Sequence, residues 1–191
     1  SAHDELRETL KLARAGARAY LKKTGRAKPL LDTLELLLTP RREAWDSLAR
    51  KDKTAIDLRL VGPMWTLRAV AELDLVGTLL IEEPLGRFEV KAAHGQLLSA
   101  TAQTGSLRIE GVMALESFLS STGEGFFVPG DVGPVPKDAP WLFETAEKAG
   151  KALEAWLSAR MRDAVSQPGK LFLHPDLSLL FSRVASDKEL K

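Results

Sequence analysis

The three histidines of this sequence, His3, His94 and His174, are the residues best suited to bind a metal ion or to act as a general base. A metal site on one face of a helix needs two such ligands three or four positions apart. These histidines are far apart in the sequence, so they form no helical metal pair. His94 stands in a predicted turn and His174 precedes Pro175, where a polar loop residue is the ordinary interpretation. We therefore expect no bound metal.

Motifs for covalent catalysis and for phosphate binding are the next candidates. The sequence has no Gly-x-Ser-x-Gly nucleophile elbow, although a catalytic triad assembled in space from distant residues stays open. Gly123 and Gly125 precede a predicted strand, whereas the glycines of a dinucleotide fingerprint follow a strand and open a helix. Gly130 and Gly133 lie among prolines, which lack the backbone N–H donors of a phosphate cradle. We therefore predict no catalytic residue and no cofactor site.

Glu82 and Glu83, at the end of a predicted strand, could form a paired-carboxylate site for acid–base chemistry. The simpler interpretation, two solvated charges beside a turn, is the one we favour. A basic face on the first predicted helix could bind an acidic partner, but a solvated face is again the favoured interpretation. Its residues are Arg7, Lys11, Arg14, Arg18, Lys22 and Lys23.

Trp141, Phe143 and Trp156 are the candidate residues for a partner interface. They belong to a predicted long helix and could form a docking surface on it. Large aromatic side chains bury readily and dominate protein cores, so we favour packing of this helix onto the domain over an interface. Both interpretations stay open.

The composition of the 191-residue chain is that of a folded domain, with 45% hydrophobic and 28% charged residues. The net charge of +1 gives no electrostatic reason to expect a nucleic-acid partner, whose phosphates require a basic surface. It gives no polybasic signal for membrane binding either. Cysteine is absent, which excludes a disulfide framework and thiolate metal sites and fits a reducing compartment.

Targeting and membrane-spanning segments are not predicted. No stretch approaches about 18 consecutive apolar residues, the length that a membrane helix needs. The first residues, Ser-Ala-His-Asp, include neither the basic nor the apolar region of a signal peptide. We therefore expect a cytoplasmic location. The chain has no initiator methionine, and we interpret it as a piece of a longer protein.

Apolar residues at steps of three and four predict helices in residues 1–53. Three helices are expected, from Asp4 to Gly25, from Pro29 to Leu38, and from Thr39 to Lys51. Asp4 and Thr39 are N-cap residue types, and Gly25 is a typical helix stop. The short turns between these helices predict a small bundle, which is either an insert or a part of the same domain.

Alternation of apolar and polar residues predicts antiparallel strands in residues 54–128. Phe88 and Val90, for example, alternate with charged neighbours. The connections are too short for crossovers, so the strands should form a meander. The expected strands are Ile56–Val61, Gly77–Glu82, Arg87–Ala92, Gln96–Ala100 and Phe126–Val128.

Helices are expected around these strands. A short one begins at Gly62-Pro63, and a second runs from about Ile109 to Ser120. Residues 129–139, rich in proline and glycine, are predicted to be a linker. Residues 140–191 predict a long helix that stops before Pro168, then a short apolar piece, Leu171–Leu173, and a last helix capped by Asp176. The predicted fold class is α+β, a small antiparallel sheet packed by helices on one side, with a short helical bundle before it and a long helix after it.

A set of motifs follows in a fixed order along residues 57–128. They are Met64–Val70, Gly77–Ile81, Phe88–Val90, His94–Ala100, Gly111–Leu115 and Gly123–Val128. This order of a Gly-x-Leu strand, a Gly-x-Leu/Ile-x-x-Ala strand, a Gly-x-x-Ala-Leu helix and a final Gly-x-Phe strand resembles the PATAN-like domain of bacterial signalling proteins. The sequence departs from the family pattern because it lacks an aromatic residue or an aspartate before the turn glycine.

Small residues in these motifs have expected physical roles. Gly95 should allow a tight turn, and Ala100 should let a helix lie close to the sheet. Gly111 and Ala114 should keep the packed face of a helix small.

The resemblance implies a non-enzymatic regulatory module that binds another signalling or motility protein. Such domains are found beside receiver and other signalling domains, with links to surface motility, and no catalytic or cofactor residue belongs to the family pattern. The alternative is a small-ligand sensor domain, or an enzyme with an unrecognised site between the meander and the helices. A sensor should show a sizeable apolar cavity with a few polar groups. An interaction module should show a filled core and an exposed apolar patch.

Replacing any of the histidines by alanine is expected to leave folding and partner binding largely unchanged, because the histidines are isolated from one another and from any nucleophile motif. Thermal unfolding of the single variants and metal analysis of the purified protein measure this. A tightly held, stoichiometric zinc ion would contradict the interpretation.

Overall fold

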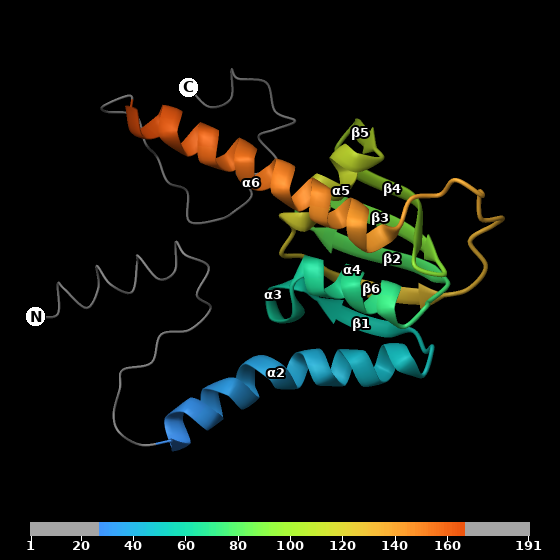
Figure 1. The fold of residues 1–191 in the computed structure, drawn as a ribbon, viewed down its shortest axis with the longest axis vertical. Helices are drawn as coiled ribbons and strands as arrows, with labels where there is room; N and C mark the ends of the chain where they lie inside the picture. Colours follow the sequence, from blue (N-terminus) through green and yellow to red (C-terminus); the bar gives the residue numbers. More distant parts are fainter. Residues whose placement is uncertain (1–26, 167–191) are drawn as a thin grey trace, which may run out of the picture. The chain divides into compact units, whose positions relative to one another are not determined.

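The computed structural model describes residues 27–166, and Figure 1 shows their helices and strands. The chain divides into two units, Ser1–Arg42 and Glu43–Lys191, which are described separately. The helix predicted from Asp4 to Gly25 lies outside the described residues. The apolar piece Leu171–Leu173 and the helix predicted after Asp176 lie outside them too.

The described part of the first unit belongs to a single helix, α2 (Lys28–Ala49), whose last turns are in the second unit. The prediction of two helices divided at Thr39-Pro40 is therefore wrong. Pro40 lies inside α2. A proline removes one backbone hydrogen bond, but its fixed φ is compatible with a helix. The leucines before it are strong helix formers, so the helix continues through it.

The second unit is built on a six-stranded antiparallel sheet, which confirms the α+β fold class. The strand order across the sheet is β1-β6-β2-β3-β4-β5. The strands are β1 (Thr54–Asp57), β2 (Gly77–Glu83), β3 (Gly86–Ala93), β4 (Gln96–Thr104), β5 (Leu107–Glu110) and β6 (Glu124–Pro129). Strands β2, β3 and β4 form the expected meander, which β5 extends by one strand, and the last strand in sequence inserts between β1 and β2.

The strand predicted at Ile56–Val61 is too long. Strand β1 ends at Asp57, and a short helix, α3 (Leu58–Val61), follows. The Asp57 carboxylate accepts a hydrogen bond from the backbone N–H of Arg59 at 2.9 Å and so caps α3. Leu58 and Val61, three positions apart, are buried, whereas Leu60 is exposed. Beyond Asp57 the apolar residues therefore follow the spacing of a helix, although they also alternate as in a strand.

Strand β5 was missed, because Ile109 was assigned to a helix. The helix there, α5, spans Val112–Leu119, and Ile109 pairs with Ala102 in the sheet. Gly111 separates the two elements at a φ of +67°, a conformation that favours glycine. A Cβ at Gly111 would meet nothing within 4 Å. Its role is therefore to make the turn between β5 and α5, and the prediction that it keeps the helix face small is wrong.

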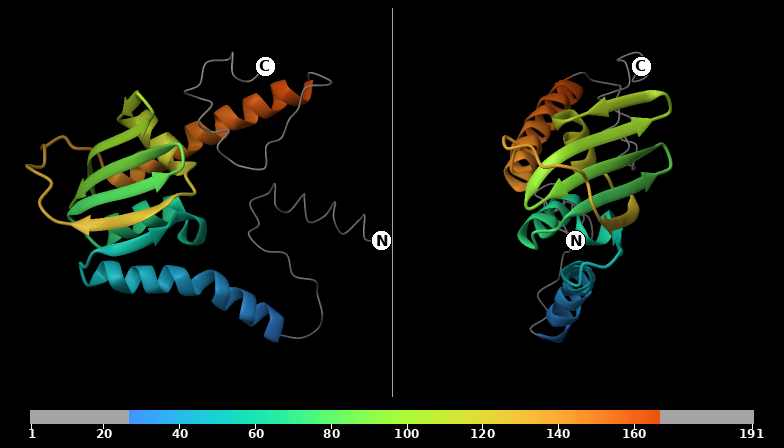
Figure 2. Two further views of the ribbon diagram at one scale, coloured as in Figure 1. Left: turned by 180° about the vertical axis from the view of Figure 1, so that it is seen from behind. Right: turned by 90° about the vertical axis from the view of Figure 1, so that its right-hand side faces the viewer.

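The helices of the second unit gather on one face of the sheet (Figure 1 and the right panel of Figure 2), as predicted. The helices that cover this face are α4 (Pro63–Glu72), α5 and α6 (Leu142–Ser166). The core between them and the sheet is fully buried, and the Phe88 ring of β3 meets the Phe118 ring of α5 edge-on at 6.0 Å. Its largest buried side chains include Leu67, Leu79, Ile81, Phe88, Leu115, Phe118, Phe127 and Leu142.

The turn between β3 and β4 is the tight turn predicted at His94-Gly95. Both residues have positive φ, +52° and +72°. Positive φ at both central positions defines the type I′ turn, whose twist matches that of antiparallel strands. The sequence signal for this hairpin was therefore correct.

Phe118→Ala is expected to lower the free energy of unfolding by about 3–5 kcal/mol, because the side chain is fully buried and its loss leaves a cavity. Urea titration followed by circular dichroism measures it. Leu85→Ala, in the exposed β2–β3 turn, is the control and should change stability by less than about 0.5 kcal/mol. Equal effects of the two variants would contradict the assignment of the core.

Candidate functional site

His94 is the described histidine, and it lies at the surface. Its Nδ1 is 3.2 Å from Oδ2 of Asp74, and both side chains are well exposed. In residues 27–166 no group of three or more His, Cys, Asp or Glu side chains could hold a metal ion. His3 and His174 lie outside the described residues.

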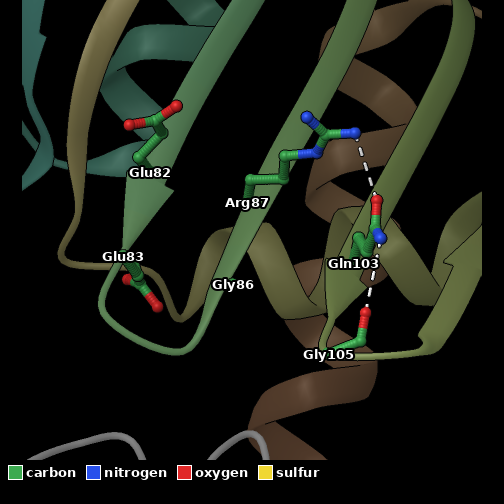
Figure 3. A pocket seen from close by; sticks show the side chains of 6 residues that line it. All are labelled: Glu82, Glu83, Gly86, Arg87, Gln103 and Gly105. Carbon is green, nitrogen blue, oxygen red and sulfur yellow. Dashed lines mark hydrogen bonds between the residues drawn. The ribbon is translucent and has the colours of Figure 1, made fainter.

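Glu82 and Glu83 are not brought together as a carboxylate pair, because neighbouring residues of a strand point to opposite faces (Figure 3). Glu83 turns toward the loop after α5. Its Oε1 accepts hydrogen bonds from the Ser121 hydroxyl at 2.6 Å and from the Thr122 backbone N–H at 2.8 Å. Its role in the structure is to join the β2–β3 hairpin to that loop.

A shallow hollow of about 260 Å³ lies beside these glutamates, at the ends of two hairpins (Figure 3). Its polar side chains bond to one another. Arg87 Nη2 donates to Gln103 Oε1 at 3.2 Å, and Gln103 Nε2 donates to the Gly105 carbonyl at 3.3 Å. The sequence identified neither Arg87 nor Gln103 as a site residue, since alternation marks both only as solvated strand positions.

The aromatic residues predicted as a possible interface do not form one patch. Trp141 precedes α6, is 56% exposed, and packs its ring over Gly95. Phe143 is half-buried beside the guanidinium of Arg68 of α4. Trp156 is half-buried about 20 Å further along the α6 axis than Phe143, as the helical rise requires. The structure therefore does not bring the three into one patch.

No described helix covers the face of the sheet opposite α4, α5 and α6, and we call it the open face (left panel of Figure 2). Its members are the strand residues that alternate with the buried ones. They are Ala55, Asp57, Thr78, Leu80, Glu82, Arg87, Glu89, Lys91, Ser99, Thr101, Gln103, Arg108, Glu110, Glu124, Phe126 and Val128.

Leu80 and Phe126 form the apolar centre of the open face. They are directly opposite each other on β2 and β6 and are 39% and 44% exposed. Ala55 of β1 lies opposite Phe126 on its other side, and Lys53 Nζ lies 4.2 Å from the Phe126 ring centroid. This pair is not predicted by the sequence patterns. The sequence does contain a signal for it, in the apolar runs Leu79–Ile81 and Phe126–Val128. Side chains alternate along a strand, so a run of three apolar residues must place at least one on the uncovered face of the sheet.

A charged row borders this centre. Asp57, Glu124 and Glu82 follow one another across β1, β6 and β2. Arg59 donates to the Asp57 carboxylate from Nε at 3.0 Å and from Nη2 at 2.8 Å, and its Nη2 reaches Glu124 at 3.4 Å. The hydrogen bond from the Arg59 side chain holds the pKa of the Asp57 carboxyl below its ordinary value, and desolvation opposes that shift.

The same row continues with basic residues on the other half of the sheet. Arg87 of β3 is opposite Glu82, and Arg108 of β5 is opposite Gln103. The guanidinium of Arg87 donates to Gln103, away from Glu82. The row is therefore acidic on β1, β6 and β2 and basic on β3 and β5.

In comparisons with known proteins, no family model, no curated protein and no solved structure matches the chain. Within the described residues, no helix is both long and apolar enough to cross a membrane.

Glu83→Ala is expected to lower the free energy of unfolding by about 1–3 kcal/mol, because it removes a charged acceptor and leaves the Ser121 hydroxyl and the Thr122 N–H without it. Glu82→Ala is the matched control. It should change stability by less than about 0.5 kcal/mol, and any gain would come from relief of the like charge of Glu124 directly opposite. Urea titrations of both variants measure the difference, and an equal loss in both would contradict the separate roles of the two glutamates.

Proposed function

We propose that this chain is a cytoplasmic, non-enzymatic module of a larger bacterial signalling protein, and that it regulates by binding another signalling or motility protein. The observation that carries the proposal is the apolar centre of the open face, Leu80 with Phe126. The proposed setting is surface motility, as the PATAN-like resemblance of residues 57–128 implies.

An uncovered sheet face is not in itself a binding site, since antiparallel sheets commonly leave one face in water. The usual content of such a face is polar. Here a leucine and a phenylalanine lie side by side in register, each more than a third exposed. An apolar centre with a polar rim is the anatomy of protein–protein interfaces, in which central aromatic residues contribute most of the binding energy.

The charged row gives this surface a means of selecting its partner. Because its acidic and basic halves lie on different strands, a partner must present charges in the complementary order. A partner with a cation above Glu82 and Glu124 and an apolar side chain above Leu80 fits best.

The alternative, a sensor or an enzyme, has the hollow beside Arg87 as its best support. Small-ligand sites are concave and mainly apolar, with a few polar groups that point inward. The hollow is shallow, and its lining residues are mostly polar or charged: Glu82, Glu83, Gly86, Arg87, Gln103 and Gly105. The hydrogen bonds of Arg87 and Gln103 are directed within the chain. The open face is therefore the better supported site.

Leu80→Asp and Phe126→Asp are expected to weaken partner binding by at least about 30-fold, the loss that corresponds to an interface hot spot of about 2 kcal/mol. The partner is first recovered by cross-linking the full-length protein in its native host, and its affinity for purified wild type and variants is then measured by titration calorimetry. Val112→Asp, at a somewhat more exposed apolar position at the start of α5, is the control and should bind like the wild type.

Two outcomes would contradict this proposal. One is unchanged binding by both open-face variants while Val112→Asp loses binding. The other is a specific small-molecule reaction of the wild type at about 1 per second or faster, a rate typical of enzymes, with no partner recovered.

A further inference from the structure

The part of α2 in the first unit carries a strongly exposed apolar surface. We call it the leucine stripe: Leu30, Leu31, Leu34, Leu37 and Leu38. Leu30, Leu31, Leu34 and Leu38 are 51%, 61%, 43% and 55% exposed, and Leu37 is half-buried. A helix of a folded protein ordinarily buries such a stripe.

The spacing of these leucines puts them on one side of the helix. Successive residues of an α-helix turn by about 100°, so Leu30, Leu31, Leu37 and Leu38 all fall within about 60° of Leu34. Leu36 falls about 160° away, on the opposite side, and is 74% exposed. The stripe is also symmetric along the chain, because its other leucines stand three and four positions before and after Leu34.

We propose that the leucine stripe binds the leucine stripe of a second copy of this chain, with the two α2 helices antiparallel and the two-fold axis at Leu34. Such an interface is isologous, so the same surface must complement itself. The symmetry of the stripe meets this requirement. Leu34 faces its own copy, while Leu30 and Leu31 of one chain face Leu38 and Leu37 of the other.

The antiparallel direction follows from Arg41, which falls in line with the stripe. In a parallel pair in register, Arg41 would meet Arg41 of the second copy, and like charges in contact are unfavourable. In the antiparallel pair centred on Leu34, each Arg41 extends past the leucines to the level of Ala27 of the other chain. The leucines can then pack without a charge between them.

This pairing uses residues of the first unit, and none of them is a member of the open face. It therefore goes beyond the proposed function, and either could fail without the other. Pairing through α2 would make the module bivalent for its partner, a property that increases avidity when both sites can be engaged.

The first test is the mass of the full chain in solution, measured by light scattering over a range of concentrations. The wild type should be a dimer, and Leu34→Glu should raise the dimer dissociation constant at least tenfold. Leu36→Glu is the matched control, since it makes the same change in the same helix at a more exposed leucine, and it should stay dimeric. Equal helix content by circular dichroism ensures that both variants are folded.

The second test reports the direction of the helices. The chain has no cysteine, so single cysteines can be introduced without background. A mixture of Leu30→Cys and Leu38→Cys chains should give a disulfide-linked heterodimer in a redox buffer, and each variant alone should give little. Strong cross-linking of Leu30→Cys to itself would show a parallel pair and overturn the proposal.

A monomeric wild type at all concentrations would also overturn it. If the Leu34 methyl signals were then protected from a soluble paramagnetic probe, another segment of the same chain would be the occupant of the stripe. Equal loss of the dimer in Leu34→Glu and Leu36→Glu would overturn the proposal too, because the stripe would then contribute no more than the opposite side of the helix.

Discussion

The burial of one face of the sheet under α4, α5 and α6 is the interaction on which the rest of the second unit depends. Side chains alternate along a strand, so burying Phe88 and Val90 decides which neighbours face away. A slip of one residue in any strand would exchange the two sets, and the cost of exposing the aromatic core prevents it. The composition of the open face, including Leu80 and Phe126, is therefore a consequence of how the core is packed.

Strand β6 connects the first strand of this unit, β1, to the meander that begins with β2. It follows the whole meander in the sequence, but in the sheet it lies between β1 and β2. Its approach requires small residues, since a side chain at Gly125 would collide with the backbone of Leu80, and one at Gly77 with the backbone of Val128. The same insertion brings Phe126 beside Leu80 and Glu124 beside Glu82. The topology of one strand thus assembles both the apolar centre and the acidic half of the charged row.

Local sequence patterns predicted those parts of the fold that are encoded locally. The alternation around Phe88 and the turn at His94-Gly95 were sufficient to predict the central hairpin. Strand β5 was missed because its apolar residues also fit the spacing of the following helix, and only pairing with β4 distinguishes the two. The end of β1 was not predicted because Ile56, Leu58 and Leu60 alternate with polar residues as in a strand, whereas Asp57 caps a helix that begins at Leu58.

The candidate surface was harder to predict than the fold, for a physical reason. Trp141, Phe143 and Trp156 are conspicuous because of their size, but the rise of the α6 helix separates Trp156 from the other two. Leu80 and Phe126 are ordinary strand residues, 46 positions apart in the sequence. They become neighbours through the pairing of β2 with β6, and no local pattern shows which strands pair or which face the helices cover.

The charged row borders the exposed apolar centre, and its charges carry a cost of their own. Like charges directly opposite in a sheet, such as Glu82 and Glu124, cost roughly 0.2–1 kcal/mol. Arg59 offsets part of that cost through its bonds to Asp57 and Glu124. The charges that remain disfavour contact with a purely apolar surface, because Glu82 would then be desolvated without a partner. They favour a surface that brings its own cation. Under the proposed function, the small loss in stability would therefore give selectivity at the surface where Leu80 and Phe126 would supply the affinity.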